Sequence, residues 1–272
     1  MRNSKDAAPR ADAAAHEMPI AAPGRIGRNA DARGPIARGP GARGAGARGA
    51  GGRGVRGAGT RDRAAQATRD GILKAAIKIF ASHGFAGGRV EQISRAAKSY
   101  DRMIYYYFGS KEGLFIAALE EIYRRFNDAE SNLKLDLARP LEALDAVVLF
   151  MWRYYQKHPE FIRLLNSENL QRGKHLSKSP RAKEYSLPAI EILASVLASG
   201  RAQGVVRADV AARDLYLTIA SLAYFYLSNR FTLSAFLGEP LEAPAAIAHW
   251  ERFIVDSVRR IVAPPGGALP DR

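Results

Sequence analysis

Residues 103 to 115 read MIYYYFGSKEGLF, in which three tyrosines and a phenylalanine stand directly before a glycine. The chain from 101 to 107 can form only two helical turns before that glycine ends it. Ser110 is a suitable N-cap for a new and longer helix that begins at Lys111. The stretch therefore predicts a very short helix, a tight break and a long helix.

The short helix has one side for a core and one side for a partner. If Ile104 faces the core, then Arg102 and Tyr106 point almost directly away from it, at about 100° per residue. Met103 and Tyr105 flank that outward side. A guanidinium, phenols and a thioether are groups that contact base edges and phosphates in a DNA groove. The pattern favours a nucleic-acid partner over simple core packing.

Two further helices are expected upstream of this stretch. An apolar stripe that includes Ile72, Ile79 and Phe80 predicts a helix from about 63 to 82. A second, short helix is expected from about 89 to 97, and a three-residue break separates it from the helix at 101. One bracing helix and two short helices across a tight turn form a helix-turn-helix arrangement.

The order of these motifs resembles the tetracycline-repressor (TetR) family of bacterial transcription regulators. The matching segments are ILKAAIKIFASHGF at 72 to 85, VEQIS at 90 to 94 and IYYYFGSKEGLF at 104 to 115. The segment GVVRADV at 204 to 210 is similar to the link between the seventh and eighth helices of that family. The resemblance implies an all-helical homodimer that binds DNA and encloses a pocket for a small-molecule effector.

Helical geometry and the resemblance together give a set of candidate DNA-binding residues. Where the family usually opens its second helix with Thr or Ser, Arg89 can replace a phosphate contact but not a cap. Tyr100 stands where a capping Ser is usual, so either Ser99 caps one residue early or the turn differs. Lys111 adds an ammonium to the free N–H groups of a helix start, which is an anion site. The candidates are Arg89, Ser99, Tyr100, Arg102, Met103, Tyr105, Tyr106, Tyr107 and Lys111.

The remainder of the chain predicts long amphipathic helices and no strand, so the fold class is all-α. A helix-turn-helix domain is expected over 61 to 113 and a helical effector-binding and dimerisation domain over 114 to 272. Helices are expected at about 111–127, 140–157, 160–170, 188–203, 210–229 and 244–262. The resemblance assigns the last two to a homodimer interface. Two recognition helices would then meet successive major grooves about 34 to 36 Å apart, on a palindromic operator in double-stranded DNA.

Candidate effector-binding residues lie in two neighbouring helices of the second domain. They are Trp152, Tyr155, Asn166, Glu168 and Asn169. Polar groups in an otherwise apolar segment are costly to bury unless something satisfies them. The last three either face an effector or cap the helix end and pair with Arg172 or Lys174, and the sequence leaves both alternatives open.

The net charge of +14 over 272 residues is concentrated towards the N-terminus. Residues 1 to 60 hold eleven Lys and Arg against four acidic residues, with arginine at every fifth position from Arg28 to Arg53. This Ala, Gly and Arg composition predicts a disordered tail. The tail is either a flexible arm that adds phosphate contacts or low-complexity sequence that is functionless or even untranslated.

Several other classes are disfavoured by composition. There is no cysteine and no apolar leader, and the longest uncharged run, 215 to 229, is shorter than a membrane span. Five scattered histidines and the absence of a catalytic arrangement argue against an enzyme, a metal site or a cofactor. We expect a cytoplasmic bacterial transcription regulator. The alternative is a DNA architectural protein that responds to no ligand.

Overall fold

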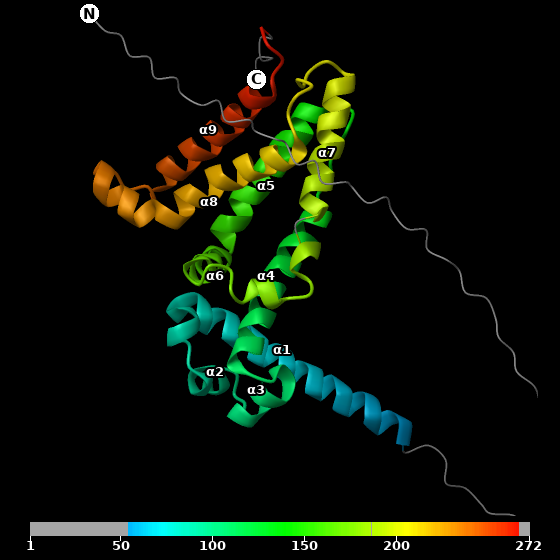
Figure 1. The fold of residues 1–272 in the computed structure, drawn as a ribbon, viewed down its shortest axis with the longest axis vertical. Helices are drawn as coiled ribbons and strands as arrows, with labels where there is room; N and C mark the ends of the chain where they lie inside the picture. Colours follow the sequence, from blue (N-terminus) through cyan, green and yellow to red (C-terminus); the bar gives the residue numbers. More distant parts are fainter. Residues whose placement is uncertain (1–53, 186, 267–272) are drawn as a thin grey trace, which may run out of the picture. The chain divides into compact units, whose positions relative to one another are not determined.

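The computed structural model describes residues 54–185 and 187–266 of the chain. Within these residues the secondary structure consists of nine α-helices and two short 3₁₀ helices, without a strand (Figure 1). The all-α prediction is confirmed for this part of the chain. The arginine repeat from 28 to 53 lies outside the described residues.

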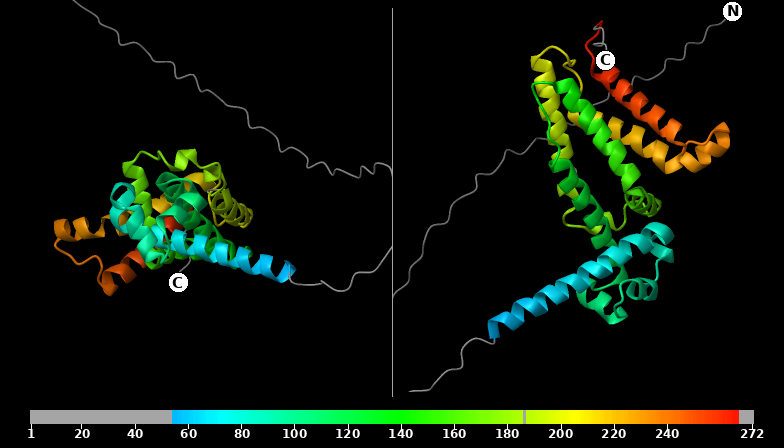
Figure 2. Two further views of the ribbon diagram at one scale, coloured as in Figure 1. Left: turned by 90° about the horizontal axis from the view of Figure 1, so that it is seen from below. Right: turned by 180° about the vertical axis from the view of Figure 1, so that it is seen from behind.

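Three helices gather around the N-terminal end of a fourth (Figures 1 and 2). They are α1 (Gly54–Gly87), α2 (Val90–Ala96) and α3 (Asp101–Phe108), and the fourth is α4 (Lys111–Ser131). Their shared core consists of fully buried side chains, among them Ile72, Phe80, Ile93, Ile104 and Leu114. The predicted helix-turn-helix head is therefore present, and we refer to α1–α3 as the head.

The first helix begins earlier than its sequence pattern indicates. Residues 54 to 60, which we assigned to the disordered tail, are helical and continue α1 towards the N-terminus. The alanine-rich stretch that follows them favours helix propagation, and this outweighs the scattered glycines. At the other end, Gly84 adopts φ 67° and interrupts the helix two residues after its predicted end at about 82.

Five long helices complete the body of the molecule. They are α5 (Pro140–Lys157), α6 (Pro159–Leu170), α7 (Leu187–Ala202), α8 (Ala212–Leu237) and α9 (Pro244–Val262). Proline occupies the first turn of α5, α6 and α9, where its missing N–H costs nothing. Helix α5 packs against α7, α8 and α9, so its apolar side chains form the centre of the body.

Two helices extend beyond the ends expected from the sequence. We placed the end of α4 near 127 and the end of α8 near 229, but they end at Ser131 and Leu237. In α8 a single charged residue, Arg230, interrupts an apolar run that resumes at once, so it does not stop the helix. The helix ends instead at Gly238, whose φ of 69° is a left-handed C-cap.

The head joins the body through α4 and through a contact between α1 and α6. The backbone N–H of Phe85 donates to the Ser167 hydroxyl at 3.3 Å. The rings of Phe85 and Phe115 lie 4.4 and 4.9 Å from the His175 ring, centroid to centroid. His175 follows α6 in the loop that contains the 3₁₀ helices η1 (Leu176–Lys178) and η2 (Ala182–Glu184). The joint is thus a small aromatic cluster.

Candidate nucleic-acid interface and inner cavities

Helix α3 presents the outward side that the sequence predicts. Ile104 is fully buried, whereas Tyr106 is 77% and Tyr105 is 53% exposed. Arg102 is also exposed, and its guanidinium lies 5.4 Å from the centre of the Tyr100 ring. An arginine held over an exposed ring is partly preorganised for a flat or anionic partner.

The turn before α3 differs from the usual arrangement. Tyr100 is the N-cap residue and makes no side-chain capping bond, and Ser99 does not replace it. The Asp101 carboxylate instead accepts a hydrogen bond from the Ser94 hydroxyl. This contact ties the first turn of α3 to α2, which fixes the direction of the exposed side chains. Lys98 completes the turn with φ 52°.

Lys111 is partly exposed and already engaged within the protein. Its ammonium donates to the Ala86 carbonyl at 3.3 Å and lies 4.9 Å from the centre of the Phe85 ring. It therefore fastens α4 to the end of α1, next to the helix start where we expected it to bind an anion. Arg89 is exposed, and its backbone N–H donates to the Gln92 side chain at 3.1 Å.

The start of α4 explains an unusual glycine. The Ser110 hydroxyl accepts from the Gly113 N–H at 2.9 Å, so the predicted cap is confirmed. A Cβ atom at Gly113 would lie 2.2 Å from the Phe108 carbonyl oxygen, far inside contact distance. The glutamate of a capping box cannot occupy this position, because the end of α3 is too close.

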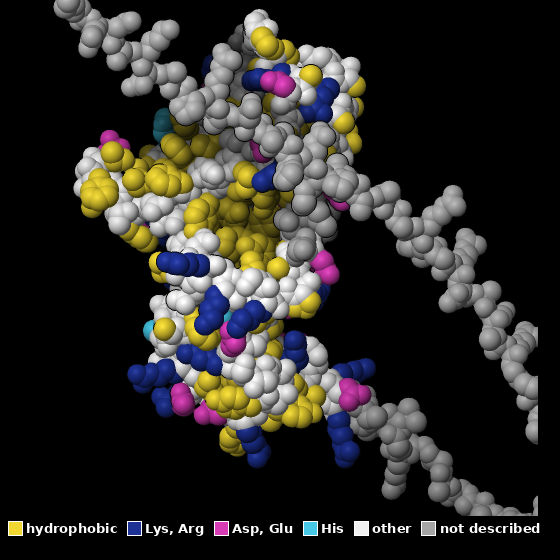
Figure 3. All heavy atoms as spheres, in the orientation of Figure 1, with side chains coloured by type: hydrophobic (Ala, Val, Ile, Leu, Met, Phe, Trp, Pro, Cys, Tyr) yellow, Lys and Arg dark blue, Asp and Glu magenta, His cyan; other side chains and the backbone are white. Residues whose placement is uncertain are grey.

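Basic side chains cover the head. Figure 3 shows Lys and Arg side chains gathered over the α1–α3 end of the molecule. A hollow of about 420 Å³ lies between α1 and the end of α2, and its lining includes Lys74, Lys78 and Lys98. All three lysines are exposed, so phosphates can approach them.

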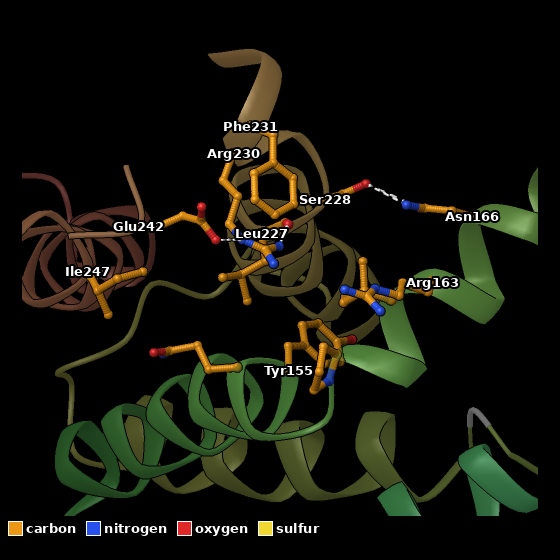
Figure 4. Close-up of a pocket in the computed structure, with 12 residues that line it drawn as sticks. Tyr155, Arg163, Asn166, Leu227, Ser228, Arg230, Phe231, Glu242 and Ile247 are labelled. Atoms are coloured by element: carbon orange, nitrogen blue, oxygen red, sulfur yellow. Dashed lines mark hydrogen bonds and ion pairs between the residues drawn. The ribbon is translucent and has the colours of Figure 1, made fainter. Parts of the chain in front are cut away.

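Two of the cavities among the described residues of the body share a wall. The first, of about 380 Å³, lies between α5, α6, α8 and the start of α9 (Figure 4). Arg163 and Arg230 contribute guanidinium groups to it, and Arg230 is paired with Glu242 at 3.1 Å. The Asn166 amide donates to the Ser228 hydroxyl at 3.0 Å, as Figure 4 shows.

The second cavity, of about 230 Å³, is aromatic and lies between α4, α5, α6 and α8. Tyr123 and Tyr185 stack at 5.6 Å, and the Tyr224 hydroxyl donates to the Asn166 amide oxygen. Burial raises the pKa of Tyr123 to about 12, so the phenol stays neutral. The lining residues are Tyr123, Phe126, Tyr155, Phe161, Leu165, Asn169, Tyr185, Tyr216, Leu217, Ala220, Ser221 and Tyr224.

The predicted effector residues lie in three kinds of place: the cavity walls, the buried core and the loop after α6. Tyr155 lines both cavities, Asn166 lines the first and Asn169 lines the second. Trp152 is fully buried and lines neither of them. Glu168 holds the loop after α6, because its carboxylate accepts from the backbone N–H groups of His175 and Leu176 and contacts the His175 ring at 2.8 Å.

Of the two alternatives for Glu168, the structure therefore matches the one in which it holds the helix end. Its partner is His175 rather than Arg172 or Lys174. Both side chains are almost completely buried. The His175 ring contacts Glu168 through Nδ1, and its buried Nε2 has no hydrogen-bond partner. The pair lies under the Phe85 ring, so it supports the joint to the head rather than a cavity wall.

Sequence reasoning missed Glu130, near the end of α4. Only 1% of it is exposed, and neither carboxylate oxygen has a hydrogen-bond partner. Burial raises the pKa of this carboxyl to about 7. A signal was available, since Glu130 continues the apolar stripe of Ile122 and Phe126 at intervals of four.

No three His, Cys, Asp or Glu side chains are placed so that they could hold a metal ion in residues 54–185 and 187–266. No helix in this part of the chain combines the length and the apolarity that crossing a membrane requires.

Comparison with known proteins identifies the family. Residues 72–118 match the family described as "Bacterial regulatory proteins, tetR family", and residues 140–258 match "Tetracyclin repressor-like, C-terminal domain". A curated relative is 52% identical over 200 residues, which cover 74% of this chain and 94% of the relative. The chain belongs to the TetR family. This TetR chain is a DNA-binding transcriptional regulator.

The relatives of this TetR chain are regulators. The 52% identical protein is the HTH-type transcriptional repressor NicS of Pseudomonas putida. The HTH-type transcriptional repressor SCO4008 of Streptomyces coelicolor is 29% identical over 163 residues, 59% of this chain and 79% of that protein. The crystal structure of the putative transcriptional regulator SCO4942 from Streptomyces coelicolor has a TM-score of 0.53 at 21% identity, covering 72% of this chain and 99% of that one. This last likeness shows the fold.

Proposed function

We propose that this chain is a homodimeric transcriptional repressor that leaves a palindromic operator when a small molecule binds in its body. One observation carries the DNA-binding site: the exposed row of Arg102, Tyr105 and Tyr106 on α3 lies on a basic head. The 52% identity to the transcriptional repressor NicS supports repression, and not activation, as the mode of regulation. The operator lies on bacterial DNA, so the protein acts in the cytoplasm.

The proposed docking places α3 in the major groove. Arg102 can bind guanine bidentately, Met103 can touch a thymine methyl, and the phenols of Tyr105 and Tyr106 can donate to phosphates. The three lysines of the hollow between α1 and α2 would bind the flanking backbone. Tyr107 is partly buried, and its ring meets Tyr106 edge to face at 5.0 Å, so it supports its neighbour.

The proposed dimer forms through α8 and α9. Both helices leave large apolar side chains exposed, and Figure 3 shows hydrophobic side chains gathered at one end of α8. An apolar surface of this extent is typical of an interface between copies, and a two-fold axis would place two heads on successive grooves. The exposed residues are Leu217, Phe225, Phe231, Phe236, Leu237, Phe253 and Ile261.

We place the effector in the second, tyrosine-lined cavity. Its walls come from α4, which runs directly into the head, and from α6, which packs against α1. A ligand that separates these walls favours a conformer with a different spacing between the two heads. If only one head of that conformer can enter a major groove at a time, it binds DNA weakly. The ligand then shifts the population towards this conformer, and DNA is released.

Footprinting tests this proposal. The full chain is incubated with the DNA upstream of its own coding region, with and without a panel of small metabolites. We expect a discrete protected site with two-fold symmetry that disappears with one class of compound. Uniform coverage that no compound relieves would instead support a DNA architectural protein, and no protection at all would contradict the docking.

A further inference from the structure

The structure assigns a ligand class to the second cavity. We infer that it takes a flat, positively charged nitrogen compound whose N–H groups donate to Glu130 while its ring lies among the tyrosines. This inference rests on the proposed effector role of the cavity. It concerns the charge of the ligand, which the fold alone does not determine.

The position of Glu130 is the first argument. Viewed along α4, Tyr123, Phe126, Asn127 and Glu130 fall within about 100° of one another, so they share one side of the helix. Tyr123 and Phe126 line the cavity. From the facing helices, the phenols of Tyr155 and Tyr216 also line it, and the Glu130 charge contributes to raising the pKa of both. Glu130 is not itself a lining residue. Its carboxylate lies next to lining residues of three helices, and the ligand's N–H groups would reach it between their side chains.

The missing donors are the second argument. Both oxygens of Glu130 and the amide oxygen of Asn127 are buried and accept no hydrogen bond. All three atoms are acceptors, so a ligand rich in N–H donors would satisfy them, and a ligand carboxylate would be repelled. A buried carboxylate without a partner is costly, and a cationic ligand removes that cost.

The aromatic walls are the third argument. Tyr123, Tyr155, Tyr185 and Tyr216 surround the cavity, and stacked or nearby ring faces attract cations. The volume of about 230 Å³ suits a single-ring compound. The first cavity differs, because Arg163 gives it positive charge while its second guanidinium, Arg230, is paired with Glu242. The charged groups near the two cavities therefore favour different classes of ligand.

Calorimetry with three probes of equal size but different charge tests the inference on the full chain. The probes are benzamidinium, benzamide and benzoate, with charges of +1, 0 and −1. We expect benzamidinium to bind at least tenfold more tightly than benzamide, and benzoate to bind most weakly. In Glu130→Gln the preference for benzamidinium should fall at least tenfold, whereas the matched surface change Glu191→Gln on α7 should leave it unchanged.

The pH dependence gives a second readout. The groups that face Glu130 from α5 and α8 are Tyr155 and Tyr216, and their pKa values are raised, so both stay neutral near pH 7. Since Glu130 must ionise to attract the cation and its pKa is about 7, benzamidinium affinity should rise about tenfold from pH 6 to pH 8. Glu130→Gln should abolish this rise.

Three outcomes would overturn the inference: equal binding of benzamidinium and benzamide, no effect of Glu130→Gln, or no binding by any of the three probes. Failure of the proposed function is recognised separately, because footprinting without any ligand tests operator binding. A protein that binds its operator but prefers benzoate would keep its function and lose the assigned ligand class.

Discussion

At the scale of single residues, Glu130 gives the molecule a pH-dependent stability. Its carboxyl pKa is about 7 in the folded protein and near 4.5 when exposed, so the folded state holds the proton more tightly. The free energy of unfolding should therefore fall as pH rises from about 4.5 to about 7 and then level off. Glu130→Gln should be more stable than the wild type at pH 8, on the order of 3 kcal/mol, and similar to it at pH 4.

Urea unfolding of both proteins at the two pH values measures this difference. Glu191→Gln is the matched control, since that glutamate is exposed on α7 and its replacement should change stability by less than about 0.5 kcal/mol at either pH. Unfolding curves for Glu130→Gln and wild type that run parallel across pH would show that the carboxyl titrates normally.

Arg102 carries the sharpest prediction for DNA binding. Arg102→Ala removes an exposed guanidinium from α3 and should raise the Kd for the operator by roughly tenfold or more, equivalent to about 1 to 3 kcal/mol. Arg213→Ala removes an equally exposed guanidinium from the start of α8 and should change the Kd less than twofold. Fluorescence anisotropy with labelled operator separates the two. Equal losses would mean that total charge, and not the α3 docking, determines affinity.

At the scale of helices, two glycines are expected to respond oppositely to the same change. Gly113→Ala forces a methyl group against the Phe108 carbonyl and should lower the free energy of unfolding by about 1 to 3 kcal/mol. Since the strain falls on the end of α3, operator affinity should fall as well. Gly71→Ala places its methyl group in open space within α1 and should stabilise the protein by about 0.5 to 1 kcal/mol.

Thermal melting and operator binding of the two variants test this pair. A neutral effect of Gly113→Ala on both would show that the junction between α3 and α4 can relax. That result would also weaken the explanation for the glycine in place of a capping-box glutamate.

The sequence predicted those helices whose ends carry local signals. Pro140 and Ser110 were placed correctly because a proline or a capping hydroxyl acts on its own helical turn. The ends of α4 and α8 were wrong because tertiary packing carries a helix past one or two polar residues. Contacts between distant parts of the chain, such as Asn166 with Tyr224, depend on how helices meet, and no local pattern specifies that.

For the whole molecule, the proposed dimer makes a direct prediction. Phe253→Asp would bury a charge in the α8–α9 interface, so light scattering should detect a monomer and operator affinity should fall together with dimerisation. Leu170→Asp changes an even more exposed side chain at the end of α6 and should leave a dimer. A stable dimer in Phe253→Asp would place the interface elsewhere.

The single ring of Tyr155 forms part of the wall of both hollows in the body. Any rotation that makes room on one side takes room from the other. A compound bound in one cavity would therefore change the room that is left in the other.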